Sequence, residues 1–197
     1  MKFRGTAAGG TAGMIVVMDT LTITRPDDWH LHLRDGSRLP DVLRHTAAQF
    51  ARAIIMPNLK PPVTTVAMAR DYRARIVAAL PPGGPPFEPL MTIYLTDNTT
   101  AAEIAAASAC GFVHAVKYYP AGATTHSDAG VTKLERAFAA IATMEKHDLP
   151  LLLHGEVTTP GVDVFDREQV FVDTAFAEVR RRFPALRIVF EHITTRE

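Results

Sequence analysis

The stretch that decides the fold is Asp27-Asp28-Trp29-His30-Leu31-His32-Leu33-Arg34-Asp35-Gly36. Successive side chains of a strand point to opposite faces, so His30 and His32 should project to one side of this run. Leu31 and Leu33 should then face the other side, towards covering helices. Two neutral imidazoles that converge from one strand suit a divalent transition metal. Taken alone the pair is a weak signal, because many strand histidines bind no ligand.

Short apolar runs alternate with longer helical patterns along the rest of the chain. The predicted strands are residues 27–33, 53–56, 90–95, 113–118, 151–154 and 188–192. Helix starts between them are predicted by capping boxes or close variants at Thr100-x-x-Glu103, Thr132-x-x-Glu135 and Asp166-x-x-Gln169. Strict alternation of strands and helices predicts a parallel sheet, either an open doubly wound sheet or a barrel.

The positions of the polar residues favour a barrel. No glycine-rich phosphate loop follows a strand, which weakens the open nucleotide-binding sheet. Polar side chains occur instead at or just after the carboxyl ends of five predicted strands: His32, Asn58, Lys117, His154 and His192. Barrel enzymes build their active sites at that rim, and an eight-unit barrel needs about 250 residues. We therefore expect about the first six β/α units of a (β/α)8 barrel of the TIM type.

The bulk composition excludes several classes of partner. The chain has 197 residues, and its 21 basic and 21 acidic side chains cancel, so no nucleic acid partner is expected. The apolar run at residues 14–18 is too short for an export signal, and no run approaches a membrane span. The single cysteine, Cys110, fits a reducing compartment. We predict a cytoplasmic protein with a flexible tail at residues 1–17 and one barrel domain at residues 18–197.

Four further segments carry distinctive motifs at the predicted strands. They are Ala53-Ile54-Ile55-Met56-Pro57-Asn58, Ala115-Val116-Lys117-Tyr118-Tyr119-Pro120-Ala121-Gly122, Leu153-His154-Gly155-Glu156-Val157 and Phe190-Glu191-His192-Ile193-Thr194-Thr195. Together with residues 25–36, and in this order, they resemble the motifs of the short bacterial-type (class II) dihydroorotases of the amidohydrolase superfamily. The resemblance runs from about residue 21 to residue 197. Gly122 departs from the asparagine that the resemblance leads one to expect.

The resemblance implies a two-zinc enzyme that reversibly hydrolyses the cyclic amide of dihydroorotate to N-carbamoyl-aspartate in pyrimidine biosynthesis. His30 and His32 would bind one zinc, and His154 and His192 the other. Lys117, carboxylated on its amine, would bridge the two metals. From the residues alone, Lys117 could equally form a buried ion pair or anchor a substrate, because a cationic lysine is repelled by a metal.

The resemblance also implies a site for the substrate carboxylate. Arg34 and Asn58 would bind that group, and the metal ligands His32 and His154 would also contact substrate. The planar guanidinium of Arg34 suits bidentate capture of a carboxylate. The alternative for Arg34 is a surface ion pair with Asp35 or Asp28.

Some expectations concern what lies outside these motifs. The family's acid/base aspartate is matched by no Asp of this chain, so we expect it beyond residue 197 and expect little turnover from the 197-residue chain alone. We expect a small-molecule substrate and a homodimer at full length. A hydantoinase-like cyclic amidase and a non-catalytic partner of an assembly remain as alternative functions.

Overall fold

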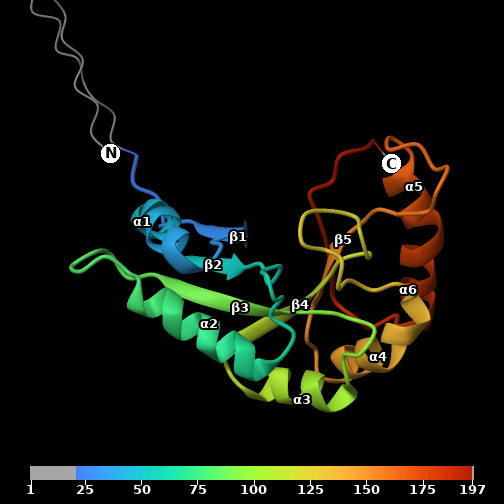
Figure 1. Cartoon of the computed structure of the whole chain (residues 1–197), viewed down its shortest axis with the longest axis horizontal. Coiled ribbons are helices and arrows are strands. Elements are labelled where there is room, and N and C mark those ends of the chain that lie inside the picture. The colour runs from blue at the N-terminus through green and yellow to red at the C-terminus, as the bar shows by residue number, and fades with distance from the viewer. Residues whose placement is uncertain (1–20, 197) are drawn as a thin grey trace, which may run out of the picture.

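The computed structural model describes residues 21–196, and the predicted tail at residues 1–17 lies outside them. The described part contains six parallel strands hydrogen-bonded in sequence order. They are β1 (Asp27–Leu31), β2 (Arg52–Ile55), β3 (Glu88–Tyr94), β4 (Val113–Tyr118), β5 (Leu151–His154) and β6 (Ile188–Glu191). The sheet curls into an open half-barrel with the helices along its outside (Figure 1). The predicted strands and their parallel order are confirmed, with ends that differ by at most two residues.

Helices fill each connection between the strands. They are α1 (Leu39–Gln49), α2 (Val66–Ala78), α3 (Ala101–Ala109), α4 (Phe138–Lys146), α5 (Arg167–Phe171) and α6 (Ala177–Arg182). Short 3-10 turns η1 (Gly36–Arg38) and η2 (Leu134–Ala137) precede α1 and α4, and the π-helical turn η3 (Val172–Phe176) joins α5 to α6. In residues 21–196, no helix is long and apolar enough to cross a membrane.

The three predicted helix caps have different outcomes. Thr100 caps α3 by accepting a hydrogen bond from the backbone N–H of Glu103, as predicted. Thr132 does not cap a helix, because its hydroxyl instead donates to Asp97 Oδ2 at 2.5 Å. Asp166 occupies the position before α5, but its side chain makes no capping hydrogen bond. The capping-box prediction at Thr132 was therefore wrong, and at Asp166 only the helix start was correct.

The two faces of the sheet have different roles. Its outer face packs on the helices in a large apolar core that includes Leu33 and contacts Leu31, as the alternation in β1 predicted. Its inner face carries a small apolar cluster of Ile54, Met56, Leu90, Ala115 and Leu152. Side chains recur on one face of a strand with period two. Two residues after members of this cluster, on the same inner face, lie Asn58, Lys117 and His154. This inner cluster, which we call the apolar floor, lies directly beneath the polar residues of the rim.

A close contact between β5 and β6 positions the residue after His154. A Cβ atom on Gly155 would lie 2.0 Å from the ring atom Cζ of Phe190. That ring packs edge-on against Phe171 and Phe176, with centroid distances of 6.0 and 5.7 Å, and so has little room to withdraw. Only glycine leaves space for the ring at this point.

We expect Gly155→Ala to lower the free energy of unfolding by about 1–3 kcal/mol, because the added methyl group overpacks this contact. Denaturant titration measures the loss. The same substitution in a Phe190→Leu background should cost less, since the smaller side chain makes room. An equal loss in both backgrounds would show that the ring contact is not the cause.

Candidate metal centre

The two histidines of the first strand converge as their spacing predicts. His30 lies near the end of β1 and His32 just beyond it, and their Nε2 atoms are 3.1 Å apart. The side chain of Asp28 accepts a hydrogen bond of 3.0 Å from the backbone N–H of His30, which fixes the strand at this point. Two ring nitrogens therefore face one point from a single strand.

His154 and His192 join this pair from the other side of the half-barrel. The ring centroids are 4.6 Å apart for His154 and His192, and 5.3 Å apart for His30 and His192. A cavity of about 210 Å³ opens among these residues, and its lining is His30, His32, Asn58, Tyr119, Thr124, His154 and His192. The structure therefore brings together four histidines from three strands that are far apart in the sequence.

Three of the four histidines have lowered pKa values, which favour the neutral form. Burial lowers the pKa of His32 to about 4, and the nearby His30 and Arg34 add to this shift. Burial and then the charge of Lys117 lower the pKa of His192 to about 4. Burial also lowers the pKa of His154, although its 2.7 Å contact with Glu156 opposes the shift. Neutral imidazoles carry the free lone pairs that a metal requires.

Lys117 lies fully buried at the centre of this group, on β4. Its Nζ donates to Oε2 of Glu191, which is itself only 8% exposed. Burial lowers the pKa of Lys117, and the attraction of Glu191 opposes this. Burial would raise the pKa of Glu191, but His30 and Lys117 outweigh it and hold that pKa below its usual value. The buried ion pair that the sequence left open for Lys117 is thus present.

The prediction from sequence missed Glu191, although its strand contained a usable signal. Ile188 and Phe190 pack against the outer core, so alternation places Glu191 on the inner face. By the same rule His192 should point outward. It faces the other histidines because its backbone is left-handed, with φ of 42°. Glu191 and His192 can therefore both reach the site from adjacent positions.

The donor set fits a transition metal in its chemistry. Four imidazoles share one small cavity, and the Nδ1 atom of His30 is buried without an aligned hydrogen bond. Across residues 21–196, however, no three His, Cys, Asp or Glu side chains are arranged to hold a metal ion as they stand. The cationic Lys117 nearby also opposes metal binding, since an ammonium group repels a metal. The residues suit a metal once that charge is removed.

Arg34 and Asn58 both lie at the rim, but with different partners. The carbonyl of Arg34 accepts a 2.5 Å hydrogen bond from the Tyr72 hydroxyl, whereas its guanidinium has no hydrogen-bond or ion-pair partner among residues 21–196. The alternative ion pair of Arg34 with Asp35 or Asp28 is absent from the described residues, and Asp35 instead binds Arg75 at 2.7 Å. Asn58 is buried and donates to the carbonyl of Thr125 at 3.2 Å.

Comparison with known proteins shows which proteins the chain resembles. The chain is 69% identical over 177 residues to a dihydroorotase from Cupriavidus necator, covering 90% of this chain and 51% of that protein. The chain is related to the dihydroorotases. It spans about half the length of the curated relatives it matches. No protein-family model matches the chain.

Solved structures agree with this relationship. A dihydroorotase from Campylobacter jejuni superposes with a TM-score of 0.79 at 36% identity, covering 87% of this chain and 49% of that one. Dihydroorotase from Saccharomyces cerevisiae in complex with 5-fluoroorotic acid superposes with a TM-score of 0.76 at 31% identity. That match covers 86% of this chain and 48% of the yeast chain. A hydantoinase from Arthrobacter aurescens, at 15% identity and a TM-score of 0.63, shares the fold. The curled sheet therefore matches part of an amidohydrolase-type (β/α) barrel.

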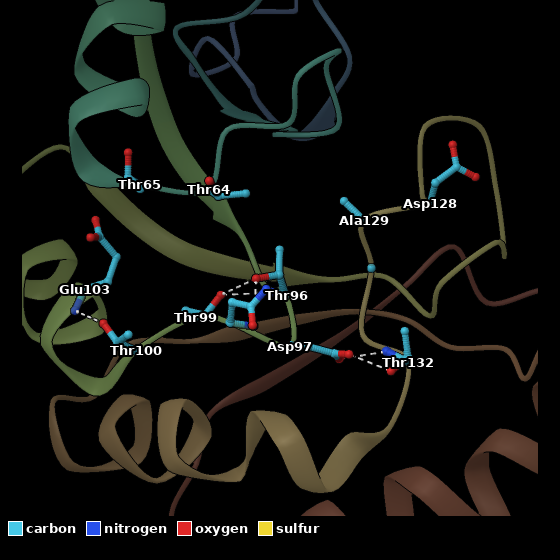
Figure 2. A pocket seen from close by; sticks show the side chains of 12 residues that line it. Thr64, Thr65, Thr96, Asp97, Thr99, Thr100, Glu103, Asp128, Ala129 and Thr132 are labelled. Atoms are coloured by element: carbon cyan, nitrogen blue, oxygen red, sulfur yellow. Dashed lines mark hydrogen bonds between the residues drawn. The ribbon is translucent and has the colours of Figure 1, made fainter.

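A second cavity of about 610 Å³ lies apart from the histidines, at the starts of α2 and α3. Threonines and carboxylates line it, and they are largely engaged with one another: Thr96 with Thr99, Thr100 with Glu103, and Asp97 with Thr132 (Figure 2). Asp97 also pairs with Arg136 at 2.8 Å. These bonds tie the loop after β3 to the loop before α4, so the cavity wall is a structural support of the rim.

The lowered histidine pKa values predict a sensitivity to acid in the metal-free chain. In the unfolded state these side chains bind protons below about pH 6.5, but His32 and His192 in the folded state do so only near pH 4. Their contribution to stability is therefore present above pH 6.5 and is lost as the pH falls to 4. For His32 we expect the free energy of unfolding to fall by about 1–3 kcal/mol over this interval.

Denaturant titration of the wild type and of His32→Asn, from pH 7 to pH 4, measures this effect. The variant should lose less stability than the wild type across the interval. His45→Asn, which removes an exposed histidine on α1, should leave the wild-type slope unchanged. Parallel pH profiles for His32→Asn and the wild type would contradict the prediction.

Proposed function

We propose that this chain supplies the metal centre and part of the substrate site of a dihydroorotase. The reaction is the reversible hydrolysis of the cyclic amide of dihydroorotate to N-carbamoyl-aspartate, in a cytoplasmic, homodimeric enzyme of pyrimidine biosynthesis. The observation that carries the proposal is the gathering of four histidines near a buried lysine at the carboxyl rim of the half-barrel. The identity of 69% to a dihydroorotase supports the same assignment.

Zinc is the metal that we propose for this centre. His30 and His32 would hold one ion, and His154 and His192 a second. Bound zinc would supply an activated water and polarise the carbonyl of the substrate. The lowered pKa values of His32, His154 and His192 support the assignment, because a protonated histidine cannot act as a ligand.

Lys117 is proposed to bridge the two ions as a carbamate. The ammonium group first loses one proton to give the neutral amine. Addition of this amine to carbon dioxide forms a nitrogen–carbon bond and releases a second proton, so the side chain changes from a cation to an anion. The burial that lowers the pKa of Lys117 favours the neutral amine that this step needs. The modification would also remove the charge that now repels a metal from the histidines.

The substrate is proposed to bind through its carboxylate. The unpaired guanidinium of Arg34 can donate two parallel hydrogen bonds to that group, and Asn58 can donate a third. His32 and His154 line the same cavity as Asn58 and would contact the ring of the substrate. The 5-fluoroorotic acid bound to the yeast neighbour is also a ring acid, which supports this class of ligand. The acid/base that moves the proton is assigned to no residue of this chain.

The full-length enzyme that we propose for this chain, called the intact protein below, should hydrolyse dihydroorotate. Removal of its metal with a chelator should abolish the activity until zinc is restored. Assay with dihydroorotate and, separately, with hydantoin measures both the activity and its specificity. Turnover of hydantoin without turnover of dihydroorotate would replace the proposal by a hydantoinase-like function. Activity on neither ring by the zinc-loaded protein would favour a non-catalytic partner.

Arg34→Lys should raise the KM for dihydroorotate at least about tenfold with unchanged zinc content, because lysine keeps the charge but loses the planar fork. Arg38→Lys, at an exposed position on η1, is the matched control and should behave as the wild type. Steady-state kinetics and metal analysis of both variants give the comparison. An Arg34→Lys variant with the wild-type KM would remove Arg34 from the substrate site.

A further inference from the structure

Glu191 is a buried carboxylate among the proposed metal ligands, and neither the proposed ligand set nor the substrate site includes it. It ends β6 and lies opposite His154 in the register of β5 and β6. Alternation directs its side chain to the inner face, where apolar residues form the floor. A carboxylate is costly to bury unless its oxygens find partners, so its partners indicate its role.

Each oxygen of Glu191 contacts a different proposed ligand. Oε2 accepts from Nζ of Lys117 on β4, and Oε1 lies 3.0 Å from Nδ1 of His30 on β1. That Nδ1 atom is buried and has no aligned hydrogen bond, so Oε1 is the acceptor that a small rotation of the ring would bring into line. Because β1 and β6 are the two edge strands of the sheet, one carboxylate joins opposite ends of the half-barrel across its interior.

We infer that Glu191 is a positioning residue that fixes the orientation of His30 and Lys117 for the metal centre. This inference rests on the proposed function. A histidine whose Nδ1–H is directed at a carboxylate presents Nε2 to a metal in a fixed tautomer and orientation. Nε2 of His30 already lies 3.1 Å from Nε2 of His32. A carbamate on Lys117 would keep one N–H, from which Glu191 can still accept a hydrogen bond.

The charge of Glu191 is as important to this role as its shape. In the metal-free chain it balances the ammonium group of Lys117, and with metal bound it would offset part of the added positive charge. A glutamine could still accept a hydrogen bond from His30 through its oxygen. Its NH₂ group would face the nitrogen of Lys117, and no hydrogen bond would form there because both groups are donors. An alanine would leave both ligands without a partner.

Zinc affinity of the intact protein tests the inference, measured by competition with a chromophoric chelator. We expect Glu191→Gln to weaken zinc binding by about 10–100-fold, the usual effect of losing a partner of a ligating histidine, and Glu191→Ala to weaken it further. The visible spectrum of the cobalt-substituted protein should change in both variants. The carbamate carbon signal of protein prepared with ¹³C-labelled bicarbonate should weaken in Glu191→Gln.

Glu103→Gln is the matched control, because Glu103 also loses a charge but bonds the backbone N–H of Val66 at 2.6 Å, away from the histidines. It should keep the zinc affinity and cobalt spectrum of the wild type. If Glu191→Gln lowers the melting temperature but leaves zinc affinity and the cobalt spectrum unchanged, the role is only structural and the inference fails. An intact wild-type protein that binds no zinc overturns the proposed zinc centre, and with it this inference.

Discussion

The positive charge of Lys117 in the dry interior of the half-barrel is the constraint on which the rest of the site depends. Moving an ammonium group out of water costs several kcal/mol unless an opposite charge and hydrogen bonds compensate it. Glu191 provides that charge, and it is itself buried. The surrounding histidines respond to the same cation, because Lys117 contributes to the lowered pKa values of His32, His154 and His192. Burial is the largest cause of these shifts, and the charge of Lys117 acts in the same direction on all three histidines.

Period-two alternation explains why the architecture was predictable from sequence. A parallel strand covered by helices must be apolar on its outer face, so polar residues within an apolar run are assigned to the inner face. That rule placed His30 with His32 and placed Leu31 and Leu33 against the helices, as found. Parallel order then brings all the carboxyl ends to one rim. The convergence of the histidines follows from those two facts without any knowledge of side-chain contacts.

Other features depend on contacts between distant segments, which a local pattern does not encode. Thr132 has the spacing of a helix cap, yet Asp97 on another loop offers its hydroxyl a better partner. Glu191 was passed over because the adjacent histidine matched the expected pattern, although alternation favoured the glutamate for the inner face. The prediction for His192 reached the correct location through an incomplete argument, since only its left-handed backbone turns it inward.

That backbone belongs to a wider pattern of strain at the rim. Of the four non-glycine residues with positive φ in residues 21–196, three lie beside the histidine cluster: Arg34, His126 and His192. Such conformations cost about 1–3 kcal/mol each and persist only where surrounding contacts hold them. Tyr72 bonds the carbonyl of Arg34, and Nδ1 of His126 lies 3.3 Å from the carbonyl of Asn58. At His192 this left-handed backbone lies where a side chain must depart from strict alternation to reach the site. Strain and proposed chemistry coincide because a regular strand can offer only every second residue to the site, whereas this site uses adjacent ones.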